Sequence, residues 1–218
     1  MFHVKHNTAS FTPEDFRSLA NVSCETIEKL HVYSDLLHKW HASINLVGSR
    51  TITEIWHRHF YDSAQIYPYL EPNGLVIDLG SGAGFPGLVL AVMGHQNVTL
   101  IESNGKKCAF LRDVCQRLSL DVIVCQSRIE NCRTLPRAKY VVSRALAPLE
   151  KLLSFAYPLL GLGGVCVFLK GATVETELTA ARKHWIMNCT AIPSHTSPEG
   201  VILTVGGLEP KDDRLESE

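Results

Sequence analysis

Apolar residues in the first part of the chain recur at helical spacing. Between residues 13 and 41 they fall every three or four positions and form one stripe, which predicts an amphipathic helix. Thr12 suits the N-cap of this helix, and Pro13 suits its first position. A second helical stretch is expected over residues 52–69, so residues 1–72 are predicted to form an N-terminal helical extension. The stripe consists of Leu30, Tyr33, Leu37 and Trp40.

The hydrophobic pattern changes from residue 75 onward. Short apolar runs of strand length alternate with helical stretches, such as 106–118 and 149–157. This alternation predicts an α/β domain with a doubly wound, mostly parallel sheet that is covered by helices on both faces. We expect this domain to span residues 73–208 and a flexible acidic tail to follow at 209–218. The expected strands are 75–79, 98–101, 121–125, 140–143, 165–170 and 201–205.

The first expected strand runs into a glycine-rich loop. Residues 76–87 read Val-Ile-Asp-Leu-Gly-Ser-Gly-Ala-Gly-Phe-Pro-Gly. Gly80, Gly82 and Gly84 let backbone amides approach a ligand without intervening Cβ atoms. A helix from about Gly87 would point its N-terminal amides at that ligand. This pattern indicates a nucleotide-cofactor site, because a tight turn without a ligand seldom needs so many glycines.

Two classes of cofactor fit this loop. Gly82, Gly84 and Gly87 satisfy the G-x-G-x-x-G pattern of dinucleotide-binding proteins, with Glu102 placed as a ribose ligand. The S-adenosylmethionine loop also has an acidic residue two positions before its first glycine, here Asp78. A carboxylate is compatible with a methionine ammonium but repels a pyrophosphate. The segment favours S-adenosylmethionine, with a nicotinamide-dependent oxidoreductase as the alternative.

The composition is that of an ordinary globular protein. Apolar residues make up 45% and charged residues 20% of the 218 positions, which suits one α/β domain with a small extension. The longest apolar stretch, residues 158–169, is short and interrupted by glycines, which argues against a membrane span. The seven cysteines form no C-x-x-C pair, and the first residues lack a secretory signal pattern. We expect a cytoplasmic monomer.

The net charge of −1 hides an uneven distribution. Residues 103–185 contain thirteen Lys or Arg residues and six acidic residues, whereas the ends of the chain are acidic. A polyanionic partner is therefore plausible for the middle of the chain. Solvated helix faces are the alternative explanation.

Polar residues follow five of the expected strands. Ligands of doubly wound sheets bind at the carboxyl ends of the strands, near the point where the strand order reverses. We therefore expect these residues to meet at one ligand site. They are Asp78 with the loop glycines, Glu102 and Ser103, residues 127–130, Ser143 and Arg144, and Lys170 and Gly171.

These segments, taken in order, resemble those of the bacterial small-subunit ribosomal RNA methyltransferase G family, also called glucose-inhibited division protein B. The resemblance covers nearly the whole chain. Two features depart from it: Val47 stands where the family usually has Thr, and the acidic tail has no counterpart. The matching segments are Asn45-Leu46, residues 58–63 and 78–87, Glu102-Ser103, Lys106-Lys107, residues 127–130, Ser143-Arg144-Ala145 and Leu169-Lys170-Gly171.

The resemblance implies a class I S-adenosylmethionine-dependent methyltransferase fold, that is, a Rossmann-like sheet. It implies methyl transfer to N7 of a guanine in the helix 18 loop of 16S ribosomal RNA, with naked RNA or the small ribosomal subunit as substrate. It also implies cofactor contacts at Gly80, Phe85, Ile129, Glu130 and Arg144.

The residue types predict how the remaining roles divide. We expect Asp78 to meet the methionine moiety and Glu102 the ribose hydroxyls, with Gly82 and Gly84 completing the cofactor loop. The planar guanidinium of Arg144 suits a carboxylate or a base edge.

Contacts with RNA are expected at three other side chains. Lys170 and Arg128 suit phosphates, and His59 is expected either to meet RNA or to brace the extension against the site. Structural ion pairs and solvated lysines are the simpler alternatives for the cations.

Guanine N7 has a lone pair and no proton, so methyl transfer to it needs no general base. The chain has neither the Asn-Pro-Pro-Tyr loop nor the Pro-Cys pair that are typical of methyltransferases acting on other positions of bases. We expect Arg144 and Lys170 to be the catalytic residues, acting by orientation and charge. The histidines lack partners at a metal-binding spacing, so no metal is expected. A non-catalytic RNA-binding protein with the same fold is the remaining alternative.

Overall fold

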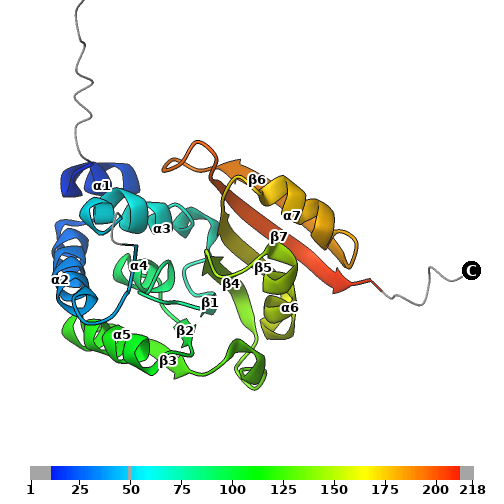
Figure 1. Cartoon of the computed structure of the whole chain (residues 1–218), viewed down its shortest axis with the longest axis horizontal. Coiled ribbons are helices and arrows are strands. Elements are labelled where there is room, and N and C mark those ends of the chain that lie inside the picture. The colour runs from blue at the N-terminus through cyan, green and yellow to red at the C-terminus, as the bar shows by residue number, and fades with distance from the viewer. Residues whose placement is uncertain (1–10, 49–50, 212–218) are drawn as a thin grey trace, which may run out of the picture.

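The computed structural model describes residues 11–48 and 51–211, and these form a seven-stranded sheet with helices on both faces (Figure 1). The strand order is β3-β2-β1-β4-β5-β7-β6, and β7 alone runs antiparallel to the other six strands. This arrangement confirms the predicted doubly wound α/β fold. The strands are β1 (Val76–Leu79), β2 (Val98–Glu102), β3 (Val122–Gln126), β4 (Ala138–Arg144), β5 (Leu160–Lys170), β6 (Trp185–Pro193) and β7 (Val201–Pro210).

Two buried clusters of apolar residues pack against the two faces of the sheet. One cluster joins α2 (Cys24–His41), α4 (Gly87–Val92) and α5 (Gly105–Arg117) to the sheet. The other joins α6 (Leu149–Ala156) and α7 (Val174–Ala181) to it. Since α2 belongs to the first cluster, the N-terminal extension shares a core with the sheet. The domain division near residue 72 stays a prediction.

The helix expected over residues 13–41 is two helices, so this prediction was wrong in detail. Helix α1 (Pro13–Ala20) ends at Asn21, which adopts a left-handed conformation with φ 49°. The side chain of Ser23 then accepts a hydrogen bond from the Thr26 amide and caps α2. A left-handed Asn followed by a new N-cap stops one helix and starts another at a different angle.

The second expected helical stretch consists of short pieces. They surround a six-residue π-helical turn (Trp56–Tyr61), a type of turn that is frequent at functional sites. The other pieces of this stretch are 3₁₀ turns at Ile52–Glu54 and Tyr67–Tyr69 and the single turn α3 (Asp62–Ala64). Two further 3₁₀ turns, at Ile129–Asn131 and Tyr157–Leu159, lie elsewhere in the chain.

The C-terminal part of the sheet contains a strand that the sequence did not predict. Residues of β6 alternate between partly buried and exposed, and none is fully buried, because β6 is an edge strand. Strand β7 continues to Pro210, two residues into the expected acidic tail, and residues 212–218 of that tail lie outside the described residues. Among the described helices, none combines the length and apolarity needed to cross a bilayer.

Candidate functional site

Two adjoining cavities lie over the carboxyl ends of the parallel strands. The β3-side cavity, of about 400 Å³, is bordered by the ends of β2 and β3. The extension-side cavity, of about 580 Å³, is bordered by the N-terminal extension and by the loop between β6 and β7. Gly80, Gly82, Arg144 and Ala145 line both cavities. Because the two cavities share this wall, one elongated ligand can reach from one to the other.

The glycines of the loop after β1 have different surroundings. Gly82 has φ +58°, and a Cβ atom there would point into open space, with its nearest neighbour 3.8 Å away. Gly84 lines neither cavity, and a Cβ there would clash with the Tyr33 hydroxyl and with Leu88. Gly80 lines both cavities, but a Cβ there would meet Leu146 at 2.5 Å. Gly82 is therefore placed to admit a ligand, whereas Gly80 and Gly84 are also needed for packing.

The carboxylate of Glu102 is fixed at the floor of the β3-side cavity. Its Oε2 accepts a hydrogen bond from the Gly82 amide at 3.0 Å, and its Oε1 accepts one from the Asn104 amide at 2.7 Å. Each oxygen keeps a second lone pair, because a carboxylate accepts about four hydrogen bonds. The geometry suits a ligand with neighbouring hydroxyl groups, such as a ribose.

Asp78 lies beneath the glycine loop and lines neither cavity. It is fully buried, its Oδ2 accepts a hydrogen bond from the Gly87 amide at 3.1 Å, and its Oδ1 has no hydrogen-bond partner among residues 11–48 and 51–211. Burial raises the pKa of this carboxyl from 3.8 to about 7. The structure thus places Asp78 as a brace of the loop and does not bring it to the cavity surface, where we expected a ligand contact.

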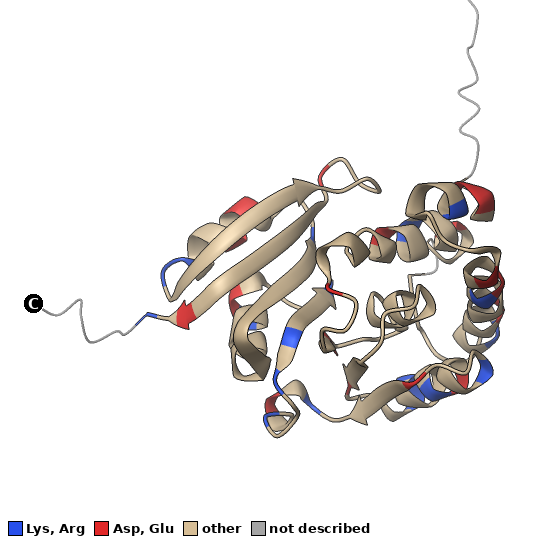
Figure 2. Cartoon of the chain, turned by 180° about the vertical axis from the view of Figure 1, so that it is seen from behind, with Lys and Arg blue, Asp and Glu red and all other residues tan. Residues whose placement is uncertain are grey.

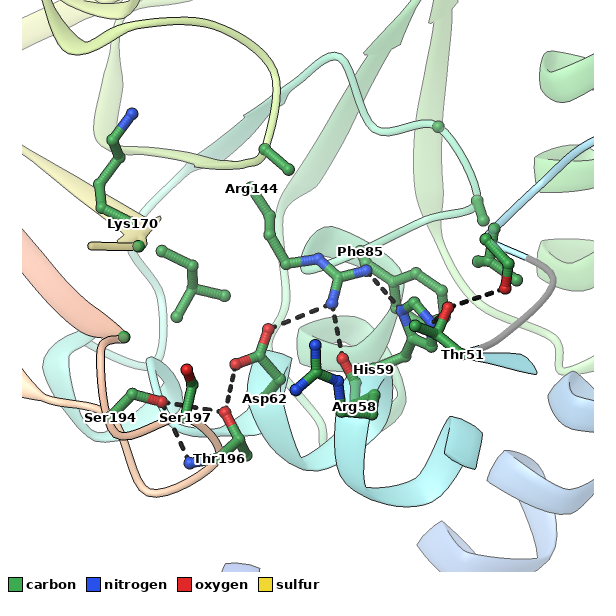
Figure 3. Close-up of a pocket in the computed structure, with 18 of the residues that line it drawn as sticks. Thr51, Arg58, His59, Asp62, Phe85, Arg144, Lys170, Ser194, Thr196 and Ser197 are labelled. Atoms are coloured by element: carbon green, nitrogen blue, oxygen red, sulfur yellow. Dashed lines mark hydrogen bonds and ion pairs between the residues drawn. The ribbon is translucent and has the colours of Figure 1, made fainter. Parts of the chain in front are cut away.

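Arg144, at the end of β4, is held by three groups of the N-terminal extension (Figure 3). Its Nη1 donates to the Arg58 carbonyl at 2.9 Å and lies 3.1 Å from Asp62 Oδ2, and its Nη2 donates to His59 Nδ1 at 2.7 Å. The guanidinium also stands 4.8 Å above the centre of the Phe85 ring. The position of Arg144 is therefore set by the extension.

His59 is neutral and its proton lies on Nε2. The Thr51 hydroxyl donates to the Gly48 carbonyl at 2.9 Å, so it accepts from His59 Nε2, which lies 2.9 Å away. Nδ1 is then free to accept from Arg144. Burial and the neighbouring Arg144 and Arg58 lower the pKa of His59 from 6.5 to about 3. His59 is 7% exposed, so its side chain positions Arg144 and is not accessible to RNA.

Phe85 contributes to the wall of the extension-side cavity from within an aromatic cluster. Its ring stacks on His59, with centroids 4.9 Å apart, and on Tyr33, with centroids 5.7 Å apart. The ring is 4% exposed. Its packing against Tyr33 of α2 and His59 of the π-helical turn therefore fixes the loop after Gly84 in place.

Lys170 lines the extension-side cavity, but its charge is already paired. Its Nζ lies 2.5 Å from Glu177 Oε2 and donates to the Ala147 carbonyl at 3.2 Å. Glu177 also accepts a hydrogen bond from the Leu149 amide. Figure 3 shows the Lys170 side chain extending away from the Arg144 cluster. The structure therefore provides no free ammonium at this position for a phosphate or for catalysis.

The segment after β3 forms the outer wall of the β3-side cavity. Ile129 is partly buried against the core cluster of α6 and α7, whereas Arg128 and Glu130 are exposed. All three residues line the cavity. Their position suits contact with a flat ring system by one apolar and two polar side chains.

The loop between β6 and β7 contributes residues that the sequence did not predict. The Thr196 hydroxyl donates to Asp62 Oδ1 at 2.5 Å, and the His195 amide donates to Gln65 Oε1 at 2.5 Å. These partners are more than 125 residues apart along the chain, and no local pattern signals the contact. The loop and the extension are therefore joined beside Arg144.

No metal-binding arrangement is found within residues 11–48 and 51–211. In that part of the chain, no three His, Cys, Asp or Glu side chains gather into a group that could hold an ion. The chemistry of the site is therefore described from the side chains and backbone groups given above.

Comparison with known proteins identifies the family. A family model described as rRNA small subunit methyltransferase G matches residues 26–199. Ribosomal RNA small subunit methyltransferase G of Paramagnetospirillum magneticum is 50% identical over 192 residues, which cover 88% of this chain and 93% of that protein. The protein of the same name from Rhodospirillum centenum is 45% identical over 203 residues, with 93% and 94% coverage.

A solved structure shares the fold. M. jannaschii TYW2 in complex with AdoMet matches with a TM-score of 0.56 and 16% sequence identity, over 78% of this chain and 80% of that chain. At this identity the likeness concerns the fold alone. The family model, however, spans most of the chain, and the matches to the two relatives extend over nearly the whole length of those proteins. The chain therefore belongs to the rRNA small subunit methyltransferase G family.

Proposed function

We propose that this protein transfers the methyl group of S-adenosylmethionine to N7 of a guanine in the helix 18 loop of 16S ribosomal RNA. The observation that supports it best is the pair of cavities that meet at the glycine loop. The β3-side cavity contains the Glu102 carboxylate, and the extension-side cavity is lined by Arg58 and Arg144. The names of the relatives support a small-subunit ribosomal RNA as the acceptor.

The residues present fit the cofactor. Glu102 has free lone pairs for the two ribose hydroxyls, and Ile129 and Glu130 flank the place of the adenine. Gly80 and Gly82 border the passage toward the extension-side cavity, where Arg144 can meet the methionine end. When bound, S-adenosylmethionine supplies a methyl group on a sulfonium that is reactive toward nucleophiles.

We assign Asp78 an indirect role in cofactor binding. The hydrogen bond between its carboxyl and the Gly87 amide ties the end of β1 to the start of α4 across the glycine loop. The carboxyl therefore positions the backbone that borders the cofactor. A direct contact with the methionine ammonium would require the loop to open.

The reaction requires alignment of the acceptor and no proton removal. Guanine N7 carries a lone pair and no hydrogen, so it can attack the methyl group directly. His59 could not act as a base in any case, because its Nδ1 accepts from Arg144 and its Nε2 donates to Thr51. We propose that Arg144 orients the reactants at the junction of the cavities, and that Lys170 supports the wall through Glu177.

The accessibility of N7 favours a guanine in a loop. In an A-form helix the N7 atom lies in a deep, narrow major groove that side chains do not enter. A guanine in a loop or bulge can instead enter the extension-side cavity. The site is therefore suited to a single-stranded position of a folded RNA.

The proposal is tested by transfer of labelled methyl groups from S-adenosylmethionine to small subunits or 16S RNA isolated from a strain without this activity. Incorporation of one methyl group per particle is expected for the wild type. Glu102→Ala should bind the cofactor at least tenfold more weakly, since it lacks both ribose acceptors. Cofactor binding by the wild type without any methyl transfer to either RNA form would overturn the proposed acceptor.

A further inference from the structure

The charged side chains that line the extension-side cavity do not balance. Two carboxylates line it, and each is paired with one cation: Asp62 with Arg144 at 3.1 Å, and Glu177 with Lys170 at 2.5 Å. Arg58 also lines the cavity. Within the described parts of the chain, its guanidinium has no ion pair and no hydrogen bond. Arg58 therefore carries the unmatched positive charge of this cavity.

The backbone of Arg58 is nevertheless held in place. Arg58 lies in the π-helical turn Trp56–Tyr61, and its carbonyl accepts a hydrogen bond from Arg144 Nη1 at 2.9 Å. The side chain is exposed to solvent, and Figure 3 shows it beside the pair of Asp62 and Arg144. An accessible guanidinium without a partner, on a backbone that is already fixed, is free to form charge-assisted hydrogen bonds with an incoming anion.

We infer that Arg58 binds a backbone phosphate of the acceptor RNA next to the methylated guanine, an inference that rests on the proposed function. The planar guanidinium can donate two parallel hydrogen bonds to a phosphate. Arg58 lines only one of the two cavities, the extension-side cavity, whereas Arg144 lines both. Arg58 is therefore on the acceptor side of the site, whereas Arg144 lies at the junction of the cavities, where the cofactor can reach it. Arg58 takes the role that we expected for Lys170.

The inference is tested with three variants. Arg58→Gln removes the charge, and Arg58→Lys keeps it without the planar fork. Arg182→Gln makes the same change at an exposed residue after α7, next to the start of β6 and thus at the end of the strands opposite to the cavities. Affinity for a 16S RNA fragment that contains helix 18 is measured over a range of salt concentrations. Affinity for S-adenosylmethionine is measured alongside.

We expect Arg58→Gln to weaken RNA binding by about tenfold at 0.1 M salt, and to reduce the slope of log affinity against log salt by about 0.7–0.9. Arg58→Lys should fall between this variant and the wild type. Arg182→Gln should stay within about twofold of the wild type, and all three variants should keep their cofactor affinity. Retained cofactor binding also shows that Arg58→Gln is folded.

Two results would overturn the inference. If Arg58→Gln loses cofactor affinity but not RNA affinity, the side chain serves the methionine carboxylate. If its RNA affinity and salt slope equal those of the wild type, Arg58 makes no phosphate contact. Failure of the wild type itself to bind either this RNA or the small subunit is a different outcome, because it needs no substitution, and it overturns the proposed function together with the inference.

Discussion

The two titrating side chains of the site have opposite effects on stability. Asp78 has a folded-state pKa near 7, above its ordinary value of 3.8. The stability gained from its protonated form is fully present below pH 4 and is lost as pH rises through 7. His59 has a pKa near 3, below its ordinary value of 6.5, so stability falls as the unfolded chain takes up a proton below pH 6.5.

The Asp78→Asn variant should be less sensitive to pH than the wild type. An amide resembles the protonated carboxyl and can still accept from the Gly87 amide. We expect the variant to be more stable than the wild type at pH 8, by about 1–3 kcal/mol, and the difference to shrink at pH 5. Urea unfolding at both pH values measures this. Cofactor affinity should change by less than about threefold, and a hundredfold loss would restore a direct role for Asp78.

The His59→Gln variant should lose less stability on acidification. A glutamine amide keeps one acceptor and one donor but takes up no proton. Between pH 7 and pH 5 the wild type should lose about 2 kcal/mol more than this variant, since one proton is involved. The comparison is made by urea unfolding at the two pH values. Equal losses would mean that His59 titrates normally and that its bond to Arg144 is not maintained.

At the residue scale, the sequence predicted which residues gather at the site better than it predicted their partners. Glu102, Phe85 and Arg144 line the cavities as expected. The pairing of Lys170 with Glu177 depends on how α7 packs against the end of β5, and no local pattern contains that information. The same holds for the burial of Asp78 beneath its own loop.

At the scale of elements, the apolar runs predicted the six strands that have a regular hydrophobic pattern. Strand β6 was missed because polar and small residues such as Asn188 and Thr190 interrupt its apolar pattern. The other edge strand, β3, was predicted because Val122–Cys125 form a continuous apolar run. The break between α1 and α2 depends on the left-handed conformation of Asn21. An asparagine can either continue a helix or end it in this conformation. Propensity alone could not decide it.

Helix α2 anchors the glycine loop through one buried hydrogen bond. The Tyr33 hydroxyl donates to the Ala83 carbonyl, and the ring is fully buried. Tyr33→Phe should cost about 1–3 kcal/mol of unfolding free energy, because it leaves a buried carbonyl unpaired. It should also weaken cofactor binding, since Ala83 borders the extension-side cavity.

A matched control for this prediction is Tyr157→Phe, at a tyrosine that is 42% exposed. This variant should change the unfolding free energy by less than about 0.5 kcal/mol. Urea unfolding and cofactor titration measure both variants. If Tyr33→Phe behaves like the control, the anchor does not hold the loop in solution.

At the scale of the whole molecule, positive charges cluster on one part of the fold. Lys and Arg residues lie along α5 and in the loop between β3 and β4, as Figure 2 shows. This loop borders the β3-side cavity through Arg128. The basic surplus of residues 103–185 is therefore partly located beside the site, where a polyanion would approach it.

Cofactor specificity can be read from thermal unfolding of the whole protein. A ligand that binds only the folded state at a hundred times its Kd adds about 2.7 kcal/mol, which raises Tm by about 5–11 °C for a chain of this size. We expect S-adenosylmethionine to produce this shift and NAD to produce none. A shift with NAD alone would favour the oxidoreductase that the glycine pattern left open.

The most direct test of the proposed function is the identity of the methylated atom. Small subunits or 16S RNA from a strain without the activity are methylated by the purified protein, and the RNA is then reduced, cleaved at N7-methylguanine and sequenced from the break. A single cleavage in the helix 18 loop is the expected result. Methyl groups on another base, on another atom of guanine, or outside that loop would contradict it.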